Sequence, residues 1–207
     1  MLLQVNPWLN SGETVVCFGD SLTENPAGYT GPLEIALRAR GVTLVRAGRS
    51  GDKTPWALTR LETDVLARKP DAVCLFFGAN DVRVGRALWA DEPTVPPAAY
   101  ESNLTWILHL CKLAGIAKFS IIPPLYRFEG PEYEAFGEIM LPYRQAARNA
   151  ADAMQARFIP ADIAFAEEWA RHPGHTGLLL TSDGVHLNEP GCRILVRSIL
   201  SSWGLGD

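Results

Sequence analysis

The sequence predicts an α/β fold, a three-layer α/β/α sandwich with a parallel β-sheet between two layers of helices. Short, continuous apolar runs of strand length alternate with segments whose apolar residues have helical spacing. Continuous apolar runs are typical of strands that are buried on both faces, and hence of a parallel sheet. Strands that alternate with helices favour right-handed crossover connections, which place helices on both faces of the sheet.

Five apolar runs are the predicted strands. They are residues 14–18, 42–45, 72–77, 118–122 and the short run 158–159.

Helical spacing marks five segments between and after these runs. The predicted helices lie at residues 33–40, 58–65, 104–111, 140–155 and 189–203. Pro142 must lie in the first turn of its helix or kink it, and Asn188 suits the N-cap of the last one. The irregular stretches 82–97 and 123–136 follow predicted strands, where ligands of open α/β sheets bind, so we expect them to wall a site.

Length and composition indicate an ordinary globular protein with one domain over residues 1–207. Of these residues 47% are hydrophobic and 20% are charged. The net charge is −4 and no basic run interleaves with aromatic residues, so a nucleic-acid partner is not expected. No apolar run is long enough to span a membrane, and the N-terminus lacks the basic region of a signal peptide. These features predict a cytoplasmic location and leave the oligomeric state open.

The cysteines and histidines do not form a metal-binding pattern. The chain has four cysteines but no CxxC pair, and we expect buried free thiols, as in a reducing compartment. His172 and His175 are three residues apart, but no cysteine or acidic cluster completes a site near them, so they indicate a polar loop. We therefore expect no metal and no cofactor.

Four short motifs stand at predicted strand ends or at the entrance of the last helix. They are GDSL at residues 19–22, GRSGD at 48–52, GAND at 78–81 and DGVH at 183–186. Each motif is common by itself. What is specific is their joint occurrence, because the carboxyl ends of parallel strands meet at one edge of the sheet.

These motifs contain the groups that nucleophilic catalysis requires. Ser21 follows the first strand, but a serine needs a base before it becomes nucleophilic. His186 is a suitable base because histidine titrates near neutral pH, and Asp183, three residues earlier, is placed to accept the imidazole proton. Asn80 offers a neutral amide donor for an oxyanion. Asp20 and Asp81 adjoin these residues, and we expect them to hydrogen-bond the loops.

The four motifs resemble those of the SGNH hydrolases, also called the GDSL esterase/lipase family. The resemblance spans residues 19–186 and implies a flavodoxin-like five-stranded sheet of order 2-1-3-4-5. It implies a carboxylic ester hydrolase that forms an acyl-enzyme, with Ser21, Asp183 and His186 as the triad and an oxyanion hole at Ser21, Gly51 and Asn80. Family members cleave short aryl esters, acetylated sugars, lysophospholipids and thioesters, so the resemblance leaves the natural small-molecule ester open.

Two alternatives remain beside ester hydrolysis, and a third, a phosphate-binding loop, does not fit. Residues 48–54 (GRSGDKT) resemble a P-loop, but the glycine spacing does not fit one. The same triad serves acyl transfer to an alcohol, and a non-catalytic carbohydrate- or lipid-binding module shares the fold. Arg127 suits either recognition of an anionic group or an exposed surface position. The candidate substrate-binding residues are Trp89, Leu125, Tyr126, Arg127 and Phe128.

Overall fold

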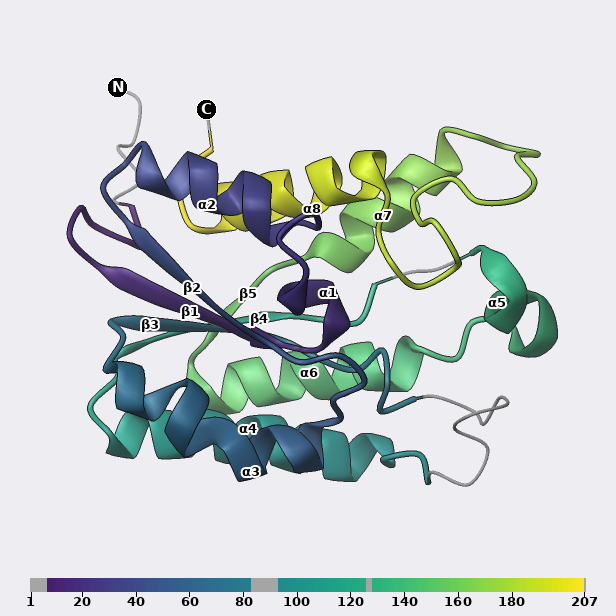
Figure 1. The fold of residues 1–207 in the computed structure, drawn as a ribbon. Coiled ribbons are helices and arrows are strands. Elements are labelled where there is room, and N and C mark those ends of the chain that lie inside the picture. The colour runs from purple at the N-terminus through teal and green to yellow at the C-terminus, as the bar shows by residue number, and fades with distance from the viewer. Residues whose placement is uncertain (1–6, 83–92, 126–127, 207) are drawn as a thin grey trace.

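Five parallel strands form the central layer of the protein (Figure 1). The structure is a computed structural model, and it describes residues 7–82, 93–125 and 128–206. The strands run in the spatial order β2-β1-β3-β4-β5, which confirms the predicted order 2-1-3-4-5. They are β1 (Thr14–Gly19), β2 (Thr43–Gly48), β3 (Ala72–Phe76), β4 (Lys118–Ile122) and β5 (Arg157–Phe158).

Helices cover both faces of the sheet, as the predicted sandwich requires (Figure 1). One face carries α2 (Thr30–Arg38), α7 (Ala161–Ala170) and α8 (Glu189–Ser202). The other carries α3 (Thr54–Asp64), the short 3₁₀ helix η1 (Leu66–Arg68), α4 (Pro97–Leu113) and α6 (Leu141–Met154). Two short helices, α1 (Ser21–Glu24) and α5 (Gly130–Phe136), lie beyond the carboxyl ends of the strands.

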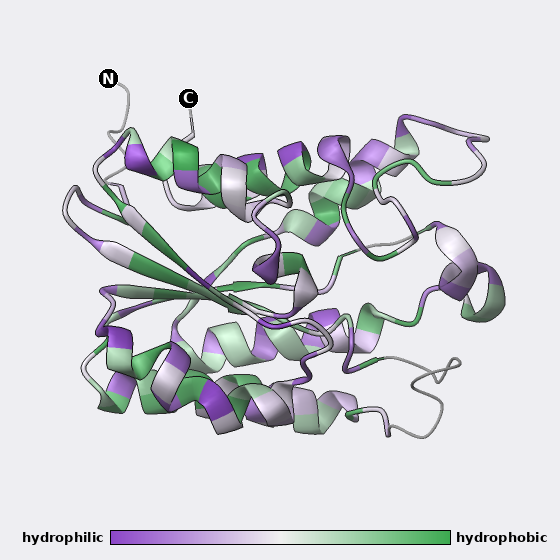
Figure 2. Ribbon diagram, in the orientation of Figure 1, coloured by the Kyte–Doolittle hydropathy of each residue, from purple (hydrophilic) through white to green (hydrophobic). Residues whose placement is uncertain are grey.

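Burial of the strands explains why their sequences are continuously apolar. Every residue of β3 is at most 2% exposed, because helices pack on both of its faces. In Figure 2 the strands and the inward sides of the helices are mainly apolar, and polar residues lie mainly on the outer sides of the helices. Two buried clusters result, one on each face of the sheet. The four cysteines are buried and free, in agreement with the sequence.

The sequence located the strands within three residues and the five expected helices at their correct places. Pro142 lies in the first turn of α6, and the Asn188 side chain caps α8 by accepting a hydrogen bond from Gly191 N. Three α-helices, α1, α5 and α7, and the 3₁₀ helix η1 were not expected. The stretch 123–136, predicted to be irregular, contains α5, and α7 follows β5 directly.

Candidate active site

The nucleophile candidate Ser21 lies where β1 ends and α1 begins. Asp20 is the N-cap of α1, and its Oδ1 accepts a hydrogen bond from Leu22 N at 3.0 Å. Helix α1 crosses closely over the end of β2, since a Cβ on Gly48 would lie 2.1 Å from Glu24 N. These contacts fix the backbone around Ser21 at the carboxyl edge of the sheet.

Asp183 and His186 come from the loop that precedes α8, and the structure brings both to Ser21. The His186 Nε2 atom is 3.1 Å from Ser21 Oγ, and His186 Nδ1 is 2.7 Å from Asp183 Oδ2. The three side chains thus form a continuous hydrogen-bonded chain from carboxylate to imidazole to hydroxyl. The Asp183 and His186 side chains are each about half exposed. These hydrogen-bonded side chains therefore lie at the surface of the protein, where substrate has access.

The Asp183 carboxylate is held in its charged form. Burial raises its pKa, but hydrogen bonds from the His186 side chain and from the backbone N–H groups of His186 and Val185 outweigh burial and lower the pKa below its usual value. The two backbone bonds go to Oδ1, at 2.7 Å and 2.8 Å, and leave Oδ2 for the imidazole. Asp183 is therefore ionised at neutral pH and orients the ring of His186.

The second motif places Gly51 in the same depression as Ser21. Gly51 has a φ of +78°, a left-handed conformation that glycine adopts without steric cost. Its neighbour Asp52 is buried, and the Asp52 backbone oxygen accepts a hydrogen bond from Asn80 Nδ2 at 3.1 Å. The loop after β2 and the loop after β3 are thereby tied to each other.

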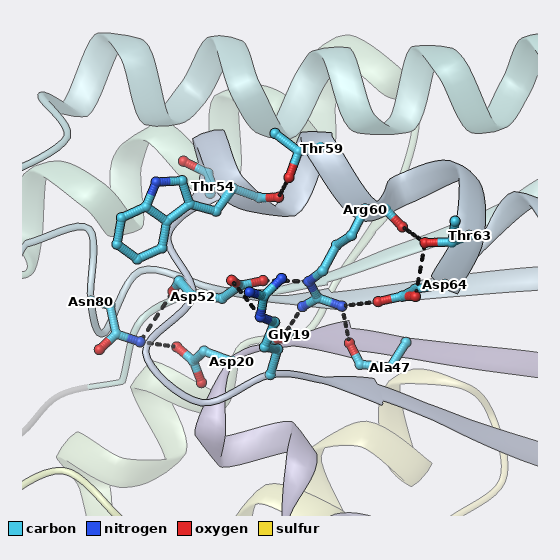
Figure 3. A network of polar contacts seen from close by, with 12 residues as sticks. Gly19, Asp20, Ala47, Asp52, Thr54, Thr59, Arg60, Thr63, Asp64 and Asn80 are labelled. Carbon is cyan, nitrogen blue, oxygen red and sulfur yellow. Dashed lines mark hydrogen bonds and ion pairs between the residues drawn. The ribbon is translucent and has the colours of Figure 1, made fainter.

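Asn80 faces the site, and its amide nitrogen also contacts the first motif. Besides Asp52, Nδ2 lies 3.3 Å from Asp20 Oδ2 (Figure 3). Asn80 is 9% exposed, so its amide is well fixed at the edge of the depression. An oxyanion would compete with these two oxygen acceptors for the hydrogens on Nδ2.

Asp81 has a structural role that agrees with the sequence. Its Oδ1 accepts hydrogen bonds from the backbone and the hydroxyl of Thr54, at the start of α3. Oδ2 is buried without a hydrogen-bond partner among the described residues. Burial raises the pKa of Asp81 to about 6, although the Thr54 bonds and the Lys53 charge act in the opposite direction.

A pH-dependent stability follows from Asp81. Because its pKa is higher in the folded than in the unfolded chain, the carboxyl group stabilises the fold at low pH, and this stabilisation is lost as the pH rises through about 6. Relative to Asp81→Asn, the wild type should gain about 2 kcal/mol in free energy of unfolding between pH 7.5 and pH 4. Urea unfolding of both proteins at the two pH values measures this. An equal difference at both values would contradict it.

The candidate site is an open depression with a small apolar cavity beside it. The depression has a volume of about 340 Å³ and is lined by Ser21, Ser50, Gly51, Ala79, Asn80, Pro131, Glu132, Asp183, Val185 and His186. The cavity shares Ala79 and Val185 with it and has room of only about 10 Å³. Its other lining residues are Asp20, Leu22, Phe76, Phe77, Pro124, Leu125 and Met140.

The predicted substrate-binding residues differ in where the structure places them. Leu125 is buried and lines the small cavity. Phe128 packs instead against Tyr133 of α5 and Trp169 of α7. Trp89, Tyr126 and Arg127 lie outside the described residues. The lining residues outside the four motifs are Pro131 and Glu132 of α5, which the sequence did not single out, although they lie in the stretch 123–136 that was expected to supply a wall.

Two further features concern metals and membranes. Within residues 7–82, 93–125 and 128–206, no group of three or more histidine, cysteine or acidic side chains is arranged to hold a metal ion. His172 pairs with Glu168 of α7, at 3.2 Å. Among the described helices, none is both long enough and apolar enough to cross a membrane.

Comparison with known proteins agrees with the fold and the motifs. Residues 17–194 match the GDSL-like Lipase/Acylhydrolase family. An acetylxylan esterase of Geobacillus stearothermophilus is 27% identical, over 95% of this chain and 96% of that protein. Its crystal structure superposes with a TM-score of 0.81 at 27% identity, over 94% of this chain and 95% of that one. Catalytic mutants of that esterase have also been solved, in which a serine, or an aspartate and a histidine three positions apart, is replaced by alanine.

A second solved structure supports the fold alone. An α/β hydrolase from the metagenome of Lake Arreo has a TM-score of 0.84 at 23% identity, over 97% of this chain and 99% of that one. The fold, the strand-end motifs and the family match together define an acylhydrolase. The chain belongs to the GDSL-like Lipase/Acylhydrolase family and is a carboxylic ester hydrolase.

Proposed function

We propose that the protein hydrolyses short-acyl esters, acetylated carbohydrates foremost, through an acyl-enzyme formed on Ser21. The observation that carries the proposal is the hydrogen-bonded chain from Asp183 through His186 to Ser21 at the edge of the depression. In this proposal His186 is the base, Asp183 orients it, and Gly51, Asn80 and the Ser21 backbone N–H stabilise the oxyanion.

Acylation begins when His186 Nε2 takes the proton of Ser21 Oγ. The oxygen attacks the ester carbonyl carbon, and the carbonyl oxygen becomes an oxyanion facing Gly51 and Asn80. As the tetrahedral intermediate collapses, the bond to the alcohol oxygen breaks and His186 returns its proton to that oxygen. The alcohol leaves and the acyl group stays on Ser21.

Deacylation repeats these steps with water as the nucleophile. His186 takes a proton from water, hydroxide attacks the acyl carbon, and the Ser21 oxygen leaves with the proton from His186. The exposed position of His186 favours water as the acceptor. Acyl transfer to an alcohol is the alternative, and product analysis with added methanol distinguishes the two outcomes.

The cavity beside Ser21 supports a preference for short acyl groups. Its room of about 10 Å³ is close to what one water molecule or methyl group needs. Its walls include the apolar residues Leu22, Leu125 and Met140, so the methyl group of an acetyl ester fits and a longer chain does not. The larger depression is partly polar and suits a hydroxyl-rich alcohol, and a homologous acetylxylan esterase supports a carbohydrate there.

A panel of esters tests the substrate class. We expect kcat/KM to fall at least 10-fold from acetyl to butyryl p-nitrophenyl ester, since a misfit of a few methylenes costs about that much. Acetylated xylo-oligosaccharides should release acetate, and a lysophospholipid should not react. Ser21→Ala measures the background on each substrate. An octanoyl ester cleaved faster than the acetyl ester would contradict the proposal.

A variant of the cavity wall sharpens this test. Met140→Ala removes side-chain volume from the cavity, so the butyryl-to-acetyl ratio of kcat/KM should rise about 10-fold. Met154→Ala is the matched control, because Met154 is the last residue of α6, whose N-cap is Met140, and does not line the cavity. An unchanged ratio in Met140→Ala would place the acyl group elsewhere.

The oxyanion role of Asn80 predicts a loss in kcat. Asn80→Ala should lower kcat by about 10²–10³-fold, or about 3–4 kcal/mol, and leave KM nearly unchanged, because the oxyanion exists only beyond the ground state. Asn103→Ala is the control: its amide bonds Thr54 near the site but does not line the depression. A raised KM with kcat unchanged in Asn80→Ala would instead make Asn80 a substrate-binding residue.

Two expectations from the sequence remain predictions. One is a single domain over residues 1–207, of which the family match covers 17–194. The other is a cytoplasmic location, which fits the four free thiols.

A further inference from the structure

One arginine is almost fully buried beneath the candidate site. Arg60 belongs to α3 and is only 6% exposed, and its guanidinium lies over the ring of Phe18 at 4.4 Å. A buried charge is tolerated when it is paired and its hydrogen-bond donors are satisfied. The partners of Arg60 therefore indicate what the charge does.

Arg60 bonds to the two segments that carry Ser21 and Gly51. Its Nη2 donates to the backbone oxygen of Gly19 at 2.8 Å, at the end of β1, and its Nη1 donates to that of Ala47 at 3.0 Å, near the end of β2. Its Nε donates to the Asp52 carboxylate. Nη1 also donates to Asp64, one turn further along α3, at 2.8 Å.

These contacts lead directly to the site (Figure 3). Gly19 lies two residues before Ser21, and Asp52 follows Gly51. The backbone oxygen of Asp52 accepts the Asn80 amide, which in turn contacts Asp20 beside Ser21. One guanidinium thus holds together the loops that carry Ser21 and Gly51. The loop that carries Asn80 is joined to them through the Asp52 backbone oxygen.

We infer that Arg60 is a positioning residue that keeps Ser21, Gly51 and Asn80 in register for the reaction. The inference rests on the proposed function of these three residues. Its physical basis is the planar guanidinium, which binds several oxygens at fixed angles, whereas a lysine ammonium is a single point charge on a flexible stem. Oxyanion donors act only when they are accurately placed, and an error of about 1 Å costs about 10²-fold in rate.

Arg60→Lys tests this inference because it keeps the charge and removes the planar set of donors. We expect kcat on p-nitrophenyl acetate to fall about 10²-fold with KM within about 3-fold of wild type. Arg144→Lys is the matched control: Arg144 is also buried, at 4% exposed, but pairs with Glu138 and Asp162, neither of which lines the depression. Its kcat should stay within about 2-fold of wild type even where its melting temperature falls equally.

Each outcome bears on the inference. A folded Arg60→Lys protein with wild-type kcat, a loss confined to KM, or an equal kcat loss in Arg144→Lys would overturn it. If Arg60→Lys does not fold, Asp52→Asn is measured instead. This variant weakens the Arg60 contact but keeps the Asp52 backbone oxygen, so a kcat equal to wild type would overturn the inference as well. Ser21→Ala separates the two proposals, because activity that survives in it refutes the proposed function, whatever Arg60 does.

Discussion

Ser21→Ala and His186→Ala are each expected to lower kcat on an activated acetyl ester by about 10⁶-fold. The reason is geometric, since Ser21 Oγ and His186 Nε2 are 3.1 Å apart and act as a unit. Without the imidazole the hydroxyl keeps its proton and does not attack, and without the hydroxyl the imidazole has no nucleophile to activate. The double variant should therefore be no slower than either single variant.

Kinetics of the three variants with p-nitrophenyl acetate measure this prediction, after circular dichroism has shown that each is folded. A fluorophosphonate probe should label the wild type and not Ser21→Ala. His109→Ala is a control, because His109 stacks on Trp106 of α4, on the outer layer of the fold. Labelling that persists in Ser21→Ala, or a loss in His109→Ala as large as in His186→Ala, would refute the assignment.

The sequence predicted the candidate site because strand ends are easy to locate. Continuous apolar runs set the carboxyl ends of β1, β2 and β3, and in a parallel sheet these ends share one edge. Ser21, Gly51 and Asn80 follow those ends directly, so their proximity follows from topology alone. Predicting the position of His186 required one further inference, namely that the loop before α8 returns to the same edge of the sheet.

The contacts around the site were less accessible to sequence reasoning. Arg60 lies off the helical stripe of Leu58, Leu61 and Val65, at a position where an arginine is ordinarily exposed. Only the structure shows that its charge turns inward to Gly19 and Ala47. The pairing depends on three segments that meet in space, and no local pattern in the chain encodes it.

Helix α5, which forms part of the wall of the site, was not predicted from the sequence for a different reason. Helix α5 has only seven residues, and its sequence, GPEYEAF, begins with glycine and proline, which favours a turn. Tertiary contacts stabilise it: Phe128 and Tyr133 pack edge-to-face, and the buried Glu129 carboxylate accepts the backbone N–H of Leu180 at 3.1 Å. Short helices of this kind depend on packing rather than on propensity.

Asp183→Asn is expected to lower kcat by about 10⁴-fold, less than the loss of Ser21 or His186. Asparagine retains an oxygen for the backbone N–H groups of Val185 and His186, so the loop should keep its shape. It then presents an amide N–H toward His186 Nδ1, which favours the tautomer whose proton lies on Nε2 and faces Ser21. That tautomer has no lone pair on Nε2 for the Ser21 proton.

A double variant that combines Asp183→Asn with His186→Ala tests how Asp183 acts. If Asp183 works only through the imidazole, Asp183→Asn combined with His186→Ala should be no slower than His186→Ala alone, because residues that act as a unit are non-additive. Stopped-flow and steady-state rates on p-nitrophenyl acetate decide this, with Asp152→Asn on α6 as a control that lies outside the depression. A further loss of about 10⁴-fold in the double variant would mean that Asp183 contributes independently of His186, and the orienting role would be refuted.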